Sequence, residues 1–169
     1  MQERILFGTY TKKTSQGIYV GTLDTTAKTL TNDGLLVATQ NPTYLALSAK
    51  DRLYSVDKED DEGGIAAWQI DGQTAHKLNT VVAPGTPPAY VAVDEARQLV
   101  YSANYHKGTA EVMKIAADGA LTLTDTVQHS GHGPRPEQDG SHIHYTDLTP
   151  DNRLAVIDLG SDKVYVYNV

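Results

Sequence analysis

The amino-acid sequence predicts an all-β protein, and two observations support this prediction. Short apolar or β-branched runs alternate with turn residues along the whole chain, and no segment shows a helical period of useful length. One phrase also recurs three times, as Pro42-Thr-Tyr-Leu-Ala-Leu, Pro88-Ala-Tyr-Val-Ala-Val and His142-Ile-His-Tyr-Thr-Asp-Leu. The tyrosines of the first two copies are 46 residues apart, and 54 residues separate Tyr90 from His144. Strand-only repeats of this length are typical of propeller blades, so we expect a β-propeller of four-stranded antiparallel blades.

The first half of the chain contains seven predicted strands in two blades. Residues 4–39 hold Ile5–Tyr10, the alternating run Ile18–Leu23, and Leu35–Thr39 after the turn signal Asn32-Asp-Gly. Residues 42–83 form a complete blade, whose strands are Tyr44–Leu47, Leu53–Val56, Ile65–Ile70 and Leu78–Ala83. Gly63-Gly64 and Asp71-Gly72 supply its later turns.

The second half repeats this organisation. Residues 88–128 form another complete blade with strands Tyr90–Val93, Leu99–Ala103, Thr109–Ile115 and Leu121–Val127, and Asp118-Gly119 makes the last turn. Residues 142–169 hold Ile143–Leu148, Leu154–Ile157 and, after Gly160-Ser-Asp, Val164–Val169.

The first and last blades are incomplete in this pattern. The N-terminal strands correspond to the second, third and fourth of a blade, and the C-terminal strands to the first, second and third. Each blade needs neighbours to bury its apolar faces, and an open arc exposes those faces and its unpaired edges. We therefore expect the C-terminal half of a propeller, or a second copy of the chain, to complete the ring.

Composition excludes several classes of function. The net charge of −7 disfavours a nucleic-acid or membrane-surface partner, because phosphate groups would be repelled. The absence of cysteine removes disulfides and thiolate catalysis. Neither a signal peptide nor an apolar run of membrane-spanning length is present. We expect a soluble, cytoplasmic protein that uses no cofactor.

Propeller topology places the start of each first strand and the end of each second strand at one mouth of the channel. The starting positions are Pro42, Pro88 and His142, and the closing positions are Tyr10, Asp57, Asn104 and Asp158. Histidine replaces proline only in the last blade, where the polar loop 135–141 precedes it. This departure from the repeat predicts that the last blade carries the functional residues.

His142 and His144 are the candidate catalytic residues. Because they are two positions apart on a strand, both side chains should project from one face. A histidine, with an ordinary pKa of about 6.5, can activate water as a general base or protonate a leaving alkoxide. The pair also resembles half a metal site, but alternation places Asp147 on the opposite face from His144. We therefore predict no metal.

Several other residues are candidate substrate ligands. The guanidinium of Arg135 can bind a phosphate or carboxylate, although a solvated loop position is an equal alternative. Asn104, Tyr105, Gln138 and Asp158 could hydrogen-bond sugar hydroxyls, while Asp158 could instead close the following hairpin or orient a histidine. The remaining residues are interpreted structurally: 57–62 as a solvated hairpin, His106, His129 and His132 as exposed, and Tyr44, Tyr54, Tyr90 and Tyr101 as blade packing.

Ordered short motifs along the whole chain carry a family resemblance. They are Phe7-Gly-Thr-Tyr-Thr, Asn41-Pro-Thr-Tyr, Ala103-Asn-Tyr, Gln138-Asp-Gly-Ser-His-Ile-His, Pro150-Asp-Asn-Arg and Asp158-Leu-Gly-Ser-Asp. Together they resemble the lactonase family of seven-bladed β-propellers, which includes bacterial 6-phosphogluconolactonase and fungal carboxymuconate cyclase. By this resemblance the chain corresponds to the N-terminal half of such a propeller.

The resemblance also implies a function. It suggests hydrolysis of a sugar lactone, 6-phosphogluconolactone to 6-phosphogluconate, with a sugar lactone or phosphosugar as the small-molecule partner. His144, six residues before Pro150, corresponds to the family's active-site histidine. The acidic and arginine residues of the family's later blades have no counterpart in this chain. A non-catalytic ligand-binding or scaffold propeller and a muconate-type lactone-forming cyclase are the alternatives.

Overall fold

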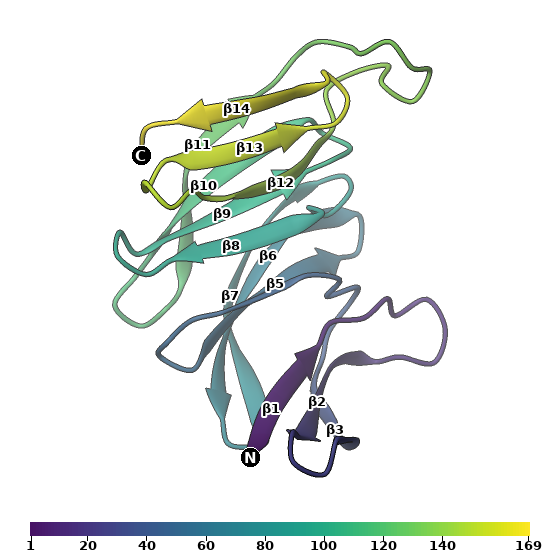
Figure 1. Ribbon diagram of the computed structural model, residues 1–169, viewed down its shortest axis with the longest axis vertical. Helices are drawn as coiled ribbons and strands as arrows, with labels where there is room; N and C mark the ends of the chain where they lie inside the picture. Colours follow the sequence, from purple (N-terminus) through teal and green to yellow (C-terminus); the bar gives the residue numbers. More distant parts are fainter.

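The computed structural model describes residues 1–169 and contains fourteen strands and no helix, which confirms the all-β prediction. The strands form four antiparallel sheets that follow one another along the long axis of the molecule (Figure 1). No element is a helix long and apolar enough to cross a bilayer.

Within each sheet the strands lie side by side in chain order. The first sheet contains β1 (Gln2–Phe7), β2 (Gly17–Asp24) and β3 (Thr29–Ala38). The second contains β4 (Leu45–Leu47), β5 (Arg52–Glu59), β6 (Glu62–Asp71) and β7 (Thr74–Pro84). The third contains β8 (Tyr90–Asp94), β9 (Leu99–Asn104), β10 (Thr109–Ile115) and β11 (Leu121–Gln128), and the fourth contains β12 (Ile143–Leu148), β13 (Leu154–Asp158) and β14 (Lys163–Tyr167).

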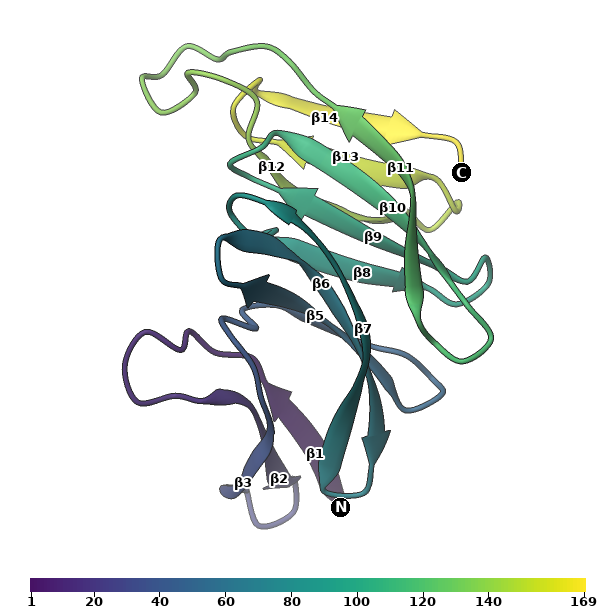
Figure 2. The same cartoon turned by 180° about the vertical axis from the view of Figure 1, so that it is seen from behind.

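Neighbouring sheets contact one another through equivalent strands. On one side β4, β8 and β12 are in contact, and on the other side β3, β7 and β11 are in contact (Figure 2). β3 therefore occupies the position of a fourth strand and β12 that of a first strand. This arrangement is the fan of blades expected for part of a propeller, with β4, β8 and β12 as the inner strands.

The core consists of three apolar clusters, one between each pair of adjacent sheets. Strand alternation sends neighbouring side chains of a central strand to opposite clusters. On β5, Leu53 joins the cluster shared with the first sheet, while Tyr54 joins the cluster shared with the third. Tyr101 on β9 is likewise buried against the fourth sheet, so Tyr54 and Tyr101 pack between blades as predicted.

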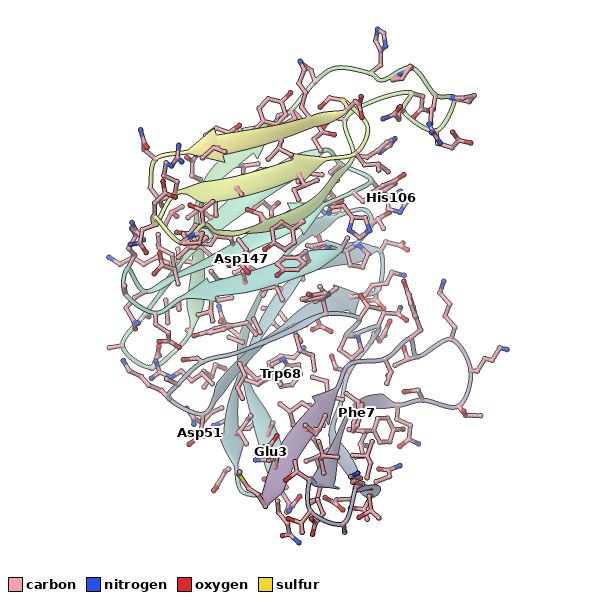
Figure 3. All side chains as sticks on the ribbon, in the orientation of Figure 1. Glu3, Phe7, Asp51, Trp68, His106 and Asp147 are labelled. Atoms are coloured by element: carbon pink, nitrogen blue, oxygen red, sulfur yellow. The ribbon has the colours of Figure 1, made fainter.

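Trp68 is the largest side chain of the cluster between the first and second sheets. It is 2% exposed and packs with Ile18 and Leu36 of the first sheet. Its indole Nε1–H donates a hydrogen bond of 2.9 Å to Ser55 Oγ, which satisfies the only polar atom of the ring. Figure 3 shows Trp68 between the two sheets.

Two predicted turns lie inside strands instead. Asn32-Asp33-Gly34 is part of β3, where the register against β2 shifts by one residue, and the actual turn is at residues 25–28. Gly34 has φ +115° and its N–H donates to Asn32 Oδ1, a conformation that glycine allows in a bulge. Gly63-Gly64 lies near the start of β6. A Cβ at Gly64 would collide with the carbonyl oxygen of Val81 on β7, so the close pairing of the two strands requires a glycine there.

Candidate active site

A cavity of about 580 Å³ lies where the four sheets meet the predicted channel mouth. Its wall takes residues from every sheet, among them Tyr10, Asn41, Pro88, Tyr105 and His144. These residues lie in the segments that lead into the inner strands and in those that follow the second strands. The cavity is on the side of the molecule where His106 is found, opposite Asp51 (Figure 3).

The lysines and histidines of the wall follow the chain order of the sheets. Lys12 lies in the loop between β1 and β2, Lys58 is on β5, His106 lies in the turn between β9 and β10, and His144 is on β12. The lining contains no aspartate or glutamate, although the chain as a whole carries a net charge of −7. The cavity is therefore suited to an anionic or electron-rich ligand.

Tyr105 brings three histidines together. The His142 ring stacks on its face, with centroids 4.4 Å apart and an interplanar angle of 10°. His106 and His144 meet it edge-on, with centroids 5.2 and 5.8 Å away. Tyr105 itself lines the cavity, as do the two edge-on histidines, while His142 supports it from behind.

His144 is exposed, and its ring nitrogens form no hydrogen bond within the chain. It lies at an irregularity in β12, between Ile143 and Tyr145, where the register against β13 shifts. Such bulges re-aim a side chain away from the regular alternation. The imidazole of His144 is thus free to bind a water molecule or substrate in the cavity.

His142 is held differently, because both ring nitrogens face acceptors. Nδ1 lies 3.0 Å from the carbonyl oxygen of Tyr105 and Nε2 lies 2.9 Å from Asp139 Oδ1. The Tyr105 carbonyl, followed by the Asp139 carboxylate, raises the pKa of His142. Both ring nitrogens are thus engaged by groups of the chain itself, unlike those of His144. The structure therefore makes His142 a support for Tyr105.

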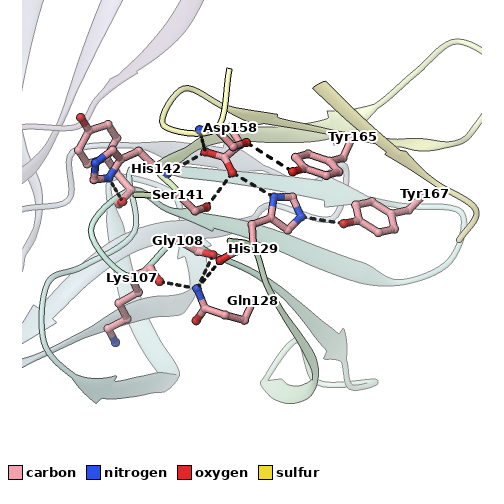
Figure 4. Close-up of polar contacts among 11 residues, drawn as sticks. Lys107, Gly108, Gln128, His129, Ser141, His142, Asp158, Tyr165 and Tyr167 are labelled. Atoms are coloured by element: carbon pink, nitrogen blue, oxygen red, sulfur yellow. Dashed lines mark hydrogen bonds and ion pairs between the residues drawn. The ribbon is translucent and has the colours of Figure 1, made fainter. Parts of the chain in front are cut away.

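Asp158 is 1% exposed and does not line the cavity. Figure 4 shows its polar contacts. Its carboxylate accepts hydrogen bonds from Ser141 Oγ and the His142 N–H, both at 2.7 Å, and from the Ser161 N–H at 3.1 Å. Burial alone would raise the pKa of Asp158, but these hydrogen bonds lower it to about 2. The structure therefore shows Asp158 closing the hairpin after β13 and holding the segment that carries His142. It does not show Asp158 at the cavity, where it could bind a sugar hydroxyl.

Asn104 and Gln138 are also used internally. Asn104 Nδ2–H donates to the Thr86 carbonyl at 2.8 Å, and Gln138 Nε2–H donates to the Leu159 carbonyl at 2.7 Å. Both side chains are buried and neither lines the cavity. Arg135 is exposed on the loop between β11 and β12, and its guanidinium makes no hydrogen bond or ion pair. It too lies outside the cavity lining, so of the predicted ligands only Tyr105 and His144 are brought together.

The prediction that His129 is exposed is wrong. The residue is 6% exposed, its Nε2 lies 2.7 Å from the Tyr167 hydroxyl, and its ring packs on Tyr165 with centroids 4.0 Å apart. Its Nδ1 is 3.4 Å from Asp158 Oδ2 (Figure 4). His129 thus holds the start of the loop between β11 and β12 against β14, while Asp158 holds the end of the same loop.

No group of three or more His, Asp or Glu side chains is arranged to hold a metal ion.

The tyrosines predicted to pack between blades form contacts near the inner strands. Asp147 accepts a hydrogen bond of 3.1 Å from the Tyr90 hydroxyl. Tyr90 also contacts Tyr44 and Tyr145, with ring centroids 4.3 and 4.6 Å apart. These three tyrosines form a ladder across the inner strands, which is a packing role for Tyr44 and Tyr90.

Lys12, Lys58 and His106 are the lysines and histidine of the cavity wall that the sequence did not single out for function. The available signal was position, since Lys58 follows the closing residue Asp57 and His106 lies two after Asn104. The closing residues Asp57, Asn104 and Asp158 turn inward and hydrogen-bond a neighbouring segment, whereas Tyr10 lines the cavity. Lys58 and Tyr105, which come immediately after Asp57 and Asn104, also line it.

Comparison with known proteins decides the family. The model of the family described as "Lactonase, 7-bladed beta-propeller" matches residues 4–169. The chain belongs to this lactonase family. The 6-phosphogluconolactonase of Bacillus subtilis is 41% identical over 96% of the chain and 48% of its own length. Lactonases of this kind are about twice as long, since the chain spans about half the length of the curated relatives it matches.

Solved structures share the lactonase fold. A crystal structure of a protein from Lactobacillus plantarum is 98% identical, has a TM-score of 0.98, and is matched over the whole chain and 50% of its own length. The periplasmic gluconolactonase of Pseudomonas aeruginosa is 26% identical with a TM-score of 0.90, matched over 99% of this chain and 50% of its own. Both confirm that the four sheets are blades of a propeller.

Proposed function

We propose that the whole protein hydrolyses a sugar lactone, with 6-phosphogluconolactone as substrate and 6-phosphogluconate as product. The observation that carries this proposal is the cavity in which an unpartnered histidine, His144, lies in a wall without carboxylates. The names of the relatives, a 6-phosphogluconolactonase and a gluconolactonase, support the same reaction.

The chemistry needs a base, a place for negative charge and a proton for the leaving oxygen. His144 takes a proton from water as the water oxygen attacks the lactone carbonyl. The carbonyl oxygen then carries negative charge, which a cavity wall without carboxylates tolerates better than an acidic wall would. When the ring C–O bond breaks, the imidazolium of His144 returns the proton to the departing ring oxygen. Water is thereby added across the ester bond and the histidine is regenerated.

The test is the His144→Gln variant of the full-length protein, assayed on 6-phosphogluconolactone. Loss of a general base lowers rates by roughly 10²- to 10⁴-fold, so most of the lactonase activity should disappear while cooperative melting is retained. His132→Gln is the matched control, because His132 is exposed on the loop after β11 and outside the cavity. A His144→Gln rate within about threefold of wild type would contradict the base assignment.

Two further measurements separate the alternatives. Thermal-shift titration of the full-length protein with sugar lactones and phosphosugars should raise the melting temperature, because a ligand that binds only the folded state stabilises it. No stabilisation at millimolar concentration would favour a scaffold propeller. Product analysis distinguishes hydrolysis from lactone formation, since a cyclase would yield the closed ring from a diacid.

A further inference from the structure

The lysines and the histidines of the cavity wall come from different parts of the chain. Lys12 and Lys58 lie within the first two blades, whereas His106 and His144 lie within the third and fourth. On the basis of the proposed function, we infer that Lys12 and Lys58 are specificity-determining residues that bind the anionic substituent of the substrate. The lactone ring then lies toward His144.

Lys58 is available for a ligand because its acidic neighbours are already paired. Asp57 and Glu59 both bind Lys77, whose Nζ lies 3.0 Å from Asp57 Oδ2 and 2.9 Å from Glu59 Oε1. Strand alternation sends Lys58 to the opposite face of β5, where it is half-buried in the cavity wall. Its ammonium makes no ion pair within the chain.

Lys12 is held at the wall by an aromatic contact. Its Nζ lies 5.1 Å from the centroid of the Tyr10 ring, and Tyr10 also lines the cavity. A cation over a tyrosine face is attracted by the ring without losing its charge. The contact with Tyr10 therefore places the ammonium of Lys12 next to the space that a ligand would occupy.

The position of Arg135 strengthens this assignment. Arg135 is exposed on the loop before β12, on the histidine side of the cavity, and does not line it. Lys12 and Lys58 are the only lysines of the wall, which contains no arginine, aspartate or glutamate. A ligand with an anionic group at one end and a reactive carbonyl at the other matches this polarity, and a phosphorylated sugar lactone has that form.

The experiment compares two substrates in full-length Lys12→Met, Lys58→Met and the double variant. For 6-phosphogluconolactone, kcat/KM should fall by about tenfold or more per lysine, mainly through KM, because a charged hydrogen bond is lost. For gluconolactone, which lacks the phosphate, kcat/KM should change less than about threefold. Lys50→Met is the matched control, since Lys50 is exposed in the turn before β5 and outside the cavity. Equal losses on both substrates, or no loss on either, would overturn the inference.

A binding measurement separates this inference from the proposed function. Inorganic phosphate or 6-phosphogluconate should raise the melting temperature of the wild type and of Lys50→Met, but not that of the double variant. If the wild type hydrolyses neither lactone but shows this lysine-dependent stabilisation, the proposed reaction is wrong and the anion site stands. If the double variant retains the full stabilisation, the lysine assignment is wrong whatever the activity.

Discussion

Asp158 is a single side chain that ties three segments of the last blade together. One oxygen accepts the backbone N–H groups of His142 and Ser161, and the other accepts the Ser141 hydroxyl. The carboxylate lies at the end of β13, yet it fixes the entrance to β12 and the turn before β14. Because His142 supports Tyr105, the geometry of the cavity wall depends on this buried carboxylate.

We expect Asp158→Asn to destabilise the full-length protein by about 2 kcal/mol at neutral pH, from the difference between a pKa of about 2 and the ordinary 3.8. Because the folded-state pKa is lowered, this stabilisation is fully present above the ordinary value and is lost as the pH falls toward 2. Denaturant unfolding of both proteins between pH 7 and 2 should show their difference shrinking over that lower range.

Asp61→Asn is the control, because Asp61 is exposed in the turn between β5 and β6 and its carboxylate makes no hydrogen bond. It should change the free energy of unfolding by less than about 0.5 kcal/mol at any pH. If Asp158→Asn lowers the free energy of unfolding by the same amount at every pH, the shape of the Asp158 side chain, rather than its charge, determines its role.

At the scale of strands and loops, a polar side chain at or near the end of β5, β9 and β13 holds a neighbouring segment. Asp57 accepts the Thr39 hydroxyl, Asn104 donates to the Thr86 carbonyl, and Asp158 accepts the His142 N–H. Each contact holds the segment that leads into the inner strand. The sequence revealed these positions through the repeat, but whether the polar group faces the ligand or its own backbone depends on the loop conformation, which the repeat does not encode.

The contact between the turn after β13 and the loop before β12 provides an element-scale test. A Cβ at Gly160 would collide with the carbonyl oxygen of Gly140, whereas a Cβ at Gly140 would meet open space. Gly160→Ala should therefore lower the free energy of unfolding by roughly 1–3 kcal/mol, as overpacking does, and should weaken the lactonase activity. Gly140→Ala is the matched control and should stay within about 0.5 kcal/mol of wild type in chemical unfolding. Equal effects of the two variants would show that the loop adapts freely.

At the scale of the whole molecule, the fold was predictable and part of the site was not. Alternating strands and the tyrosine repeat determine which faces are buried, so the order of the sheets follows from residues such as Tyr54 and Tyr101. Lys12 and Lys58 have no such signature, because an isolated lysine in a loop or an acidic hairpin looks like a solvated residue. Only the assembly of four sheets places them on one wall with His144.

The outer sheets lead to a prediction about residues 1–169 expressed alone. The first sheet exposes Phe7, Leu30 and Leu35, and the last exposes Val164 and Val166. β1 and β14 are also unpaired edges of their sheets. Such surfaces associate in water, so we expect this chain by itself to aggregate or dimerise, and addition of residues that complete the ring to suppress this. Light scattering that shows a monodisperse monomer with cooperative melting would contradict the prediction.

The burial of Trp68 gives residues 1–169 a built-in optical probe. It is the single tryptophan of the 169 residues, and its indole lies in the cluster that joins the first two sheets. Its fluorescence therefore reports water that enters the interface between the first and second sheets. It does not report changes at the other two interfaces between sheets. A spectrum that shifts to longer wavelength while circular dichroism stays constant has one meaning here: the N-terminal blade has separated from the second, with the strands still formed.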